Sequence, residues 1–223
     1  MSDAGLEDPL VRDELDRFIE TFNRLPKPPQ SVETVAATIF PSAFYQPHAA
    51  DPEKHLYALE RMTRDVVRKH PQNRRGTYFE RLVAYPTADG GHVNQIENVL
   101  GKLRSAAERG VKNSNQFELA LFHPKRDTNP IGFPCLSHLS ITLSSGLLHG
   151  TAVYRNQYFI ERAYGNLLGL GALVNFLASE SGFGNGELLC VASHAEIELG
   201  RYGRAPITEL IGRCEELLGV ASS

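Results

Sequence analysis

The sequence predicts an α+β fold in which a mixed, mainly antiparallel sheet packs against a long central helix. Apolar residues recur at helical spacing through the first half of the chain, whereas after Gly110 they begin to alternate as they do in strands. Residues 157–181 form the most apolar helical stretch and carry few charges after Arg162, which predicts a helix at the centre of the core. Helices and strands that are largely segregated along the chain are typical of the α+β class.

An N-terminal arm is predicted first. Asp8 and Pro9 form a helix start, because aspartate caps the first N–H groups and proline fits the first turn. Apolar residues then recur at helical spacing as far as Leu25, and a stiff stretch, Pro26-Lys27-Pro28-Pro29, follows. We expect residues 1–30 to form a helical arm and residues 31–223 to form the main domain.

Further helices are predicted within the main domain. Asp51-Pro52 marks the start of one, and another follows from about Asn94. The buried face of the helix after Asp51 is expected to consist of Leu56, Leu59, Met62, Val66 and Val67. Pro206 is expected to open a short C-terminal helix.

The strands are predicted from alternation and from turn residues. Phe117 to Leu121 alternate at the strand period, and residues 139–143 and 149–154 flank Ser144-Ser145-Gly146, which has the composition of a hairpin turn. Gly184-Asn185-Gly186 is expected to form a turn before a long strand at residues 187–199.

Composition excludes several classes of function. The formal charge of the 223 residues is 23 − 26 = −3, which provides no basic excess for a nucleic acid polymer. No apolar run approaches the roughly 20 residues that span a bilayer, and the N-terminus is acidic, so we expect a cytoplasmic protein without membrane contact. Three widely spaced cysteines favour free thiols over disulfides or a metal site.

Two residues are candidates for chemistry. Cys135 lies in a loop that leads into a strand, and as a thiolate it would be a nucleophile if a cation such as Arg155 were nearby. Taken alone, it is better interpreted as a small buried residue. Asn166 interrupts the apolar stripe of the central helix, where a carboxamide either bonds to the backbone or matches the N3–H and O4 edge of uracil.

Three motifs in register give these residues more weight. They are Pro134-Cys135 at the start of a strand, Tyr154-Arg155-Asn156-Gln157, and Gly165-Asn166-Leu167-Leu168. Arg155 follows Cys135 by 155 − 135 = 20 residues and Asn166 follows it by 166 − 135 = 31. With a helix after Val93-Asn94-Gln95-Ile96, these segments resemble the thymidylate synthase superfamily over residues 92–199.

The resemblance implies a thymidylate synthase-like fold and a one-carbon transferase. Cys135 would add to C6 of a pyrimidine nucleotide or nucleoside, and C5 would accept a methyl or hydroxymethyl group. Arg155 would hold phosphate and stabilise the thiolate, Asn166 would select the base, and Asn156 and Gln157 would contact the substrate. The resemblance also implies a homodimer and 5,10-methylenetetrahydrofolate as the cofactor.

The chain departs from the family where phosphate and folate bind. Residues 113–116 read Asn-Ser-Asn-Gln where the family has a Ser-Arg-Arg motif that reaches the partner subunit's phosphate. Tyr158 occupies the position of the aspartate that binds the folate ring, so Tyr158 is the predicted cofactor contact and folate itself is in question. Arg74-Arg75-Gly76-Thr77 is a partial match to the family's phosphate loop.

A further group of polar residues corresponds to the family's sugar-binding strand. His194, Glu196 and Glu198 are expected to project from one face of a strand and to bind a sugar or an amine. An exposed charged face is a commoner arrangement than a metal site, so no metal is expected. His138 would join this cluster, move a proton, or serve as a structural histidine.

Two other functions fit the same residues. The fold would modify a pyrimidine-like ring without folate in specialised metabolism, which Tyr158 favours. Alternatively, a non-catalytic nucleotide-binding protein would retain the scaffold without the missing arginines.

Overall fold

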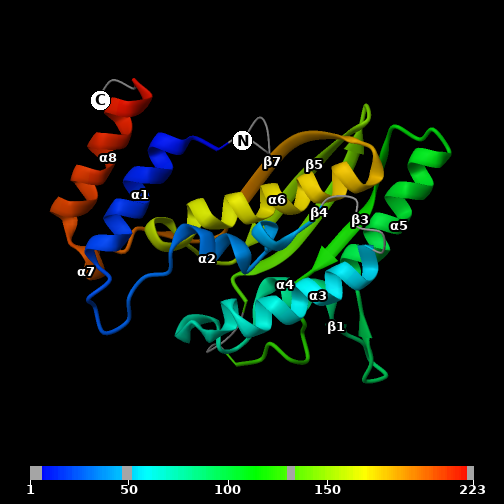
Figure 1. The fold of residues 1–223 in the computed structure, drawn as a ribbon, viewed down its shortest axis with the longest axis horizontal. Helices are drawn as coiled ribbons and strands as arrows, with labels where there is room; N and C mark the ends of the chain where they lie inside the picture. Colours follow the sequence, from blue (N-terminus) through cyan, green and yellow to red (C-terminus); the bar gives the residue numbers. More distant parts are fainter. Residues whose placement is uncertain (1–6, 47–51, 130–133, 220–223) are drawn as a thin grey trace.

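The structure is a computed structural model that describes residues 7–46, 52–129 and 134–219. The fold is α+β, as predicted, with 50% of the chain in helices and 20% in strands. Figure 1 shows the long helix α6 (Tyr164–Ser181) lying across the central sheet. Within the described ranges, no helix has both the length and the apolar character needed to cross a membrane.

The central sheet has the strand order β3-β4-β5-β7. Its strands are β3 (Ser114–Ala120), β4 (Leu136–Ser144), β5 (Leu147–Tyr154) and β7 (Gly184–Ala192). β3, β4 and β5 pair antiparallel, whereas β7 pairs parallel to β5 after the crossover through α6. The mainly antiparallel sheet is therefore confirmed, and its core is formed by the face that α6 and its neighbours cover.

The predicted hairpin is confirmed as β4 and β5. Ser145 and Gly146 form its turn with φ angles of 51° and 79°. Positive φ at both central residues is the geometry whose twist matches antiparallel strands, and glycine adopts it without strain.

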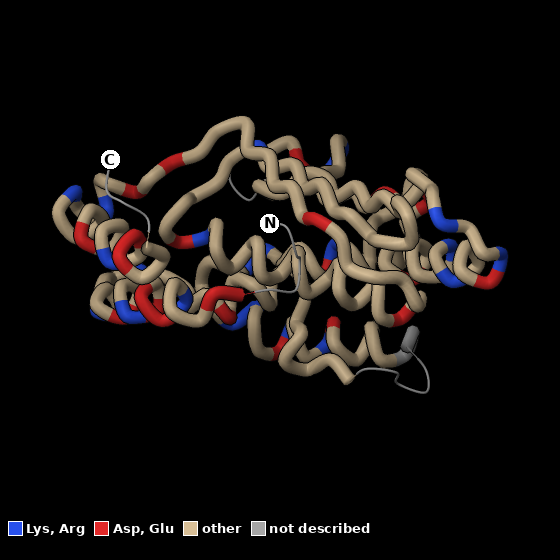
Figure 2. Tube along the Cα trace, turned by 90° about the horizontal axis from the view of Figure 1, so that it is seen from above, with Lys and Arg blue, Asp and Glu red and all other residues tan. Residues whose placement is uncertain are grey.

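The remaining helices lie on one side of the sheet or at its end, as Figure 2 shows. The α-helices are α1 (Pro9–Thr21), α2 (Val32–Ala37), α3 (Pro52–Asp65), α4 (Tyr78–Val83), α5 (Gln95–Glu108), α7 (Leu199–Tyr202) and α8 (Arg204–Leu218). The short elements are η1 (Ser42–Phe44), η2 (Val67–Lys69), η3 (Pro71–Asn73), β1 (Tyr85–Pro86), β2 (His92–Val93), β6 (Gln157–Tyr158), the π-helical turn η4 (Phe159–Ala163) and β8 (Ala195–Glu196).

Two of the predicted helix starts are confirmed by side-chain caps. The Asp8 carboxylate accepts hydrogen bonds from the N–H groups of Leu10 and Val11, and Asn94 caps α5 by accepting from the N–H of Glu97. Asp51 lies outside the described residues.

Part of the predicted buried face of α3 is wrong. Leu56, Leu59 and Val67 are buried, but Met62 is 39% exposed and Val66 is 55% exposed. The α-helix ends at Asp65, so Val66 leaves the helical register, and the buried stripe is narrower than the sequence pattern indicates.

The helix of the N-terminal arm packs against α8 of the same chain. Leu15, Phe18 and Ile19 of α1 share a small apolar cluster with Tyr202, Ile207 and Leu210, apart from the main core. Helix α1 is therefore attached to the last described helix of the chain. The division into an arm and a main domain stays a prediction.

The predicted turn at Gly184 to Gly186 is wrong, because these residues begin strand β7. A Cβ on Gly184 would lie 2.7 Å from the Leu147 side chain, and one on Gly186 would lie 2.7 Å from the His149 ring. Both glycines therefore allow close approach to β5 and do not reverse the chain. The strand ends at Ala192, well short of Leu199.

The position of α6 depends on a close contact with α2. A Cβ on Gly169 would lie 2.6 Å from the Ala36 carbonyl oxygen and 2.9 Å from the Ile39 Cβ. We expect Gly169→Ala to lower the free energy of unfolding by about 1–3 kcal/mol, because overpacking outweighs the better helix propensity of alanine. Urea denaturation followed by circular dichroism measures the change.

Gly101 in α5 provides the matched control, since no heavy atom lies within 4 Å of its added Cβ. Gly101→Ala should raise stability by about 0.5–1 kcal/mol through helix propensity alone. Equal stability of the two variants would contradict the close α2–α6 contact.

Candidate functional site

A pocket of about 590 Å³ lies between the loop before α4, the start of β4 and the beginning of α6. This volume is within the range of small-molecule sites. The lining residues are Thr38, Pro71, Gln72, Asn73, Arg74, Arg75, Gly76, Thr77, Tyr78, Arg81, Pro134, Cys135, Asn156, Gln157, Tyr158, Arg162 and Asn166. The structure thus brings Cys135, Asn156, Gln157, Tyr158 and Asn166 together, although they are up to 31 residues apart (166 − 135).

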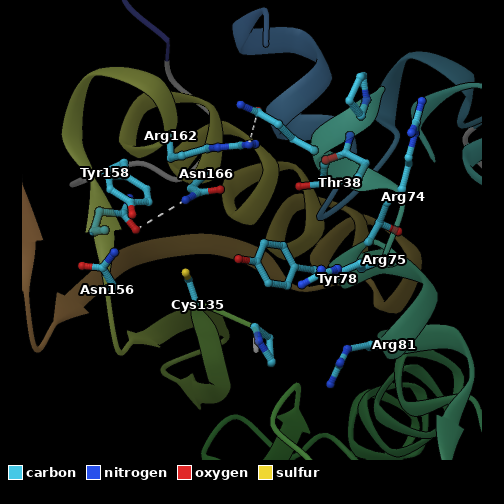
Figure 3. A pocket seen from close by; sticks show the side chains of 17 residues that line it. Thr38, Arg74, Arg75, Tyr78, Arg81, Cys135, Asn156, Tyr158, Arg162 and Asn166 are labelled. Atoms are coloured by element: carbon cyan, nitrogen blue, oxygen red, sulfur yellow. Dashed lines mark hydrogen bonds between the residues drawn. The ribbon is translucent and has the colours of Figure 1, made fainter. Parts of the chain in front are cut away.

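Cys135 is half-buried immediately before β4, and its thiol is free. Figure 3 shows the hydroxyl of Tyr78 directed towards the Cys135 sulfur. The Leu136 N–H donates to that hydroxyl oxygen at 3.4 Å. Burial raises the pKa of Tyr78, so the phenol is protonated at neutral pH.

Arg155 lies beside the backbone of Cys135 but is absent from the pocket lining. Its backbone N–H donates to the Cys135 carbonyl oxygen at 2.9 Å, and its side-chain Nε donates to the Pro134 carbonyl oxygen at 3.1 Å. The side chain therefore holds the loop that presents Cys135. The contacts of Arg155 with phosphate and thiolate stay predictions.

Asn166 is buried at 4% exposure, and its amide forms a weak contact within the pocket wall. Its Nδ2 donates to Gln157 Oε1 at 3.4 Å, so the second N–H and the Oδ1 are available to a ligand. Asn156 is held by His194, whose Nδ1 lies 2.7 Å from Asn156 Oδ1. His194 thus reaches the pocket only through Asn156.

The pocket lining carries an excess of positive charge. Its described lining contains four arginines, Arg74, Arg75, Arg81 and Arg162, and no aspartate or glutamate. Arg81 forms a bidentate ion pair with Asp127 at 2.7 and 2.8 Å and is thereby neutralised. Among the described residues, Arg74 and Arg75 form no ion pair, and both side chains are exposed. A pocket of this kind attracts anions.

The prediction that His194, Glu196 and Glu198 project from one face of a strand is wrong. Strand β8 contains only Ala195 and Glu196, because the chain turns after Ala192 and again towards α7. Glu196 is exposed, while the buried Glu198 carboxylate accepts from the N–H groups of Ile160 at 3.2 Å and Glu161 at 3.0 Å. In the part of the chain that the structure describes, no three His, Cys, Asp or Glu residues form a metal-binding group.

Glu198 is therefore expected to stabilise the π-helical turn that precedes α6. Burial raises the pKa of Glu198, and the two N–H donors oppose this shift. Glu198→Ala should lower the free energy of unfolding by about 1–3 kcal/mol, because it leaves two buried N–H groups without an acceptor. Thermal unfolding measures the loss, and Glu196→Ala, on the exposed neighbour, should change stability by less than about 0.5 kcal/mol. Similar effects of the two substitutions would contradict the capping role.

His138 lies away from the pocket. Its Nε2 contacts the Glu118 carboxylate across β3 and β4, on the face of the sheet that the helices do not cover. The contact with Glu118 is of the kind expected for a structural histidine, and it does not place the imidazole beside Cys135.

Four pocket residues have only a weak signal, or none, in the sequence. Arg74 and Arg75 had a partial motif match as their signal. Arg162 stands out in the sequence only as the last charge before the apolar stripe, and Tyr78 belongs to no motif. Arg162 and Asn166 differ by four residues, and this spacing on one helical face is the sequence signal that pairs them.

Comparison with known proteins gives two distant relatives, and no model of a protein family matches the chain. A protein of Methanocaldococcus jannaschii named "Putative thymidylate synthase" is 27% identical over 143 residues, which cover 60% of this chain and 62% of the relative. A protein of the same name from Methanothermobacter marburgensis is 25% identical over 149 residues, covering 66% of this chain and 62% of the relative. These matches support a thymidylate synthase-like relationship without indicating a specific member.

Proposed function

We propose that this protein activates C5 of a pyrimidine nucleotide for transfer of a one-carbon group, through an adduct of Cys135 at C6. The observation that carries the proposal is the pocket itself, in which Cys135 and Asn166 lie with arginines and without a lining carboxylate. Excess positive charge favours a phosphorylated ligand over a nucleoside. The names of the two relatives, which contain thymidylate synthase, agree with a pyrimidine nucleotide as the substrate.

The chemistry follows from the lining residues. The Cys135 thiolate adds to C6, and the electron pair moves through C5 towards O4, where the Asn166 amide stabilises the developing negative charge. C5 thereby becomes nucleophilic. The protonated Tyr78 hydroxyl faces Cys135 and donates its proton to C5 of the adduct, and the phenolate that remains takes a proton from the same carbon and exchanges it with solvent. Expulsion of the thiolate from C6 then restores the ring. Arg74 and Arg75 bind the phosphate.

The pocket lining matches a folate donor less well than it matches a nucleotide. When bound, 5,10-methylenetetrahydrofolate supplies a carbon at the oxidation level of formaldehyde. The described lining offers no carboxylate to accept from a folate ring, and the 39% exposed Tyr158 lies at the corresponding position. These residues do not fit the family's mode of folate binding, so a folate-independent modification is the second candidate function.

Release of tritium from C5-labelled uracil and cytosine nucleotides tests the proposal. The wild-type protein should release tritium to water, because the adduct at C6 makes the C5 proton labile. Addition of the folate should increase tritium release, or give a nucleotide modified at C5, only if the folate is the one-carbon donor. Absence of release from every nucleotide and nucleoside, with and without folate, would contradict the proposed function.

We also propose that two copies associate through the uncovered face of the sheet, as the resemblance implies. Leu147, Val153, Leu189 and Val191 project from β5 and β7 on that face and are 37–57% exposed. Val191→Lys combined with Leu189→Lys should convert a dimer to a monomer in light scattering. Met62→Lys, at an exposed residue of α3, is the control and should leave the mass unchanged. A monomeric wild-type protein would contradict the dimer.

A further inference from the structure

Arg162 is held in the pocket wall by neutral partners. It belongs to the π-helical turn before α6, and its guanidinium extends alongside Asn166 (Figure 3). Its Nη1 donates to Gln30 Oε1, and its Nη2 donates to Gln72 Oε1 at 2.6 Å. Two carboxamide oxygens therefore orient the guanidinium without neutralising its charge.

The charge of Arg162 has no acidic partner among the described residues. The neighbouring Glu161 carboxylate is already bound by Arg201 at 2.9 Å and by the Tyr202 hydroxyl at 2.9 Å. Burial lowers the pKa of Arg162, which is the expected effect of removing a cation from water without pairing it. Binding of an anion to a cation held in this way is therefore favourable.

The Gln30 side chain is itself fixed in place, and the backbone of Gln72 is anchored to the same histidine. Gln30 is 1% exposed, and its Nε2 lies 2.9 Å from His70 Nδ1. The Gln72 N–H donates to the same His70 nitrogen at 3.4 Å. Since His70 Nδ1 serves as the acceptor, the Gln30 amide is oriented with its oxygen towards Arg162. The position of the guanidinium is thus set before any ligand binds.

Arg162 occupies a different part of the pocket from the loop arginines. It precedes Asn166 by one helical turn and follows Tyr158 by four residues, so it lies beside the predicted base-reading residue. Arg74 and Arg75 come from the loop before α4, on the other side of the pocket in Figure 3.

We propose that Arg162 forms a second anion-binding position, which takes a carboxylate or phosphate oxygen beyond the phosphate bound by Arg74 and Arg75. The inference rests on the proposed function only in taking this pocket as the nucleotide site. The second oxyanion comes either from a further phosphate of the same nucleotide or from the carboxylate of a second small substrate. The pocket then accepts two acidic groups at once.

Calorimetric titration distinguishes these sources. The probes are uridine 5′-monophosphate, uridine 5′-diphosphate, and acetate added to protein saturated with the monophosphate. Arg162→Met should weaken binding of the diphosphate or of acetate about 10- to 100-fold, as expected for loss of a charge-assisted hydrogen bond, while monophosphate affinity changes less than about threefold. The probe that is weakened identifies the source of the second oxyanion.

Gln72→Glu provides a test that retains the arginine. The new carboxylate is nearly isosteric and pairs with Arg162, so it should weaken the same probe to a similar extent, whereas Gln116→Glu on the exposed part of β3 should have no effect. Unchanged binding of both probes in Arg162→Met and Gln72→Glu would overturn the inference, as would an equal loss for the monophosphate. If Arg162 binds the anion but the wild-type protein releases no C5 tritium, only the proposed function fails.

Discussion

Replacement of Cys135 by serine is expected to reduce tritium release from C5 by a factor on the order of 10⁴ or more, because the hydroxyl is a far weaker nucleophile at neutral pH. Nucleotide affinity should stay within about threefold of wild type, since phosphate and base contacts come from other residues. The measurement combines single-turnover tritium release with calorimetric titration of the monophosphate.

Cys214 provides the control for this substitution. It is also a free, half-buried thiol, but it packs against the small cluster between α1 and α8. Burial raises the pKa of Cys214, so this thiol is less reactive than an ordinary one. Cys214→Ser should retain wild-type release. If Cys135→Ser also retained release, Cys135 would not be the nucleophile, and a non-catalytic role for it would follow.

Removal of the loop arginines is expected to have the second largest effect. Arg74→Ala and Arg75→Ala should each weaken nucleotide monophosphate binding by about 10- to 100-fold, because each removes a charge-assisted hydrogen bond worth roughly 1.5–3 kcal/mol. Binding of the uncharged nucleoside should be unchanged. Titrations of nucleotide and nucleoside with each variant measure the difference.

The same contacts predict a dependence on salt. Arg74 and Arg75 are exposed, so raising the ionic strength should weaken nucleotide binding in the wild-type protein and have less effect in the double variant. Arg61→Ala, on the exposed side of α3, is the matched control and should bind nucleotide as the wild type does. An equal loss of nucleoside and nucleotide affinity would show that these arginines support the loop and do not bind phosphate.

Local patterns were sufficient to predict most of the fold. The Asp8 cap, the helix start near Asn94 and the Ser145-Gly146 turn each depend on a few adjacent residues, and each is confirmed. The turn predicted at Gly184 to Gly186 is wrong because Gly184 and Gly186 allow contact with β5, a partner distant in sequence. A glycine that faces another strand has the same sequence signal as a glycine in a turn.

The candidate site shows the same limit. The spacing of Cys135 and Asn166 indicated that they act together, and the structure places both in one pocket. The resemblance predicts a phosphate contact for Arg155, but the bond from its Nε to the Pro134 carbonyl oxygen depends on how the loop folds and has no signal in the sequence. The spacing of Arg162 and Asn166 pairs these two residues in the sequence, but only the three-dimensional surroundings show that Arg162 is held by amides in place of acids.

The most direct test of Cys135 attack on a pyrimidine is covalent trapping with a 5-fluorouracil nucleotide. Once C5 has accepted the one-carbon group from the folate, its fluorine cannot leave as the proton does, so the adduct at C6 accumulates. Mass spectrometry of the intact protein, followed by peptide mapping, should show one added nucleotide on the peptide that contains Cys135, and no addition to Cys135→Ser. No adduct on the wild-type protein, with or without the folate, or an adduct mapped to Cys190 or Cys214, would contradict the account.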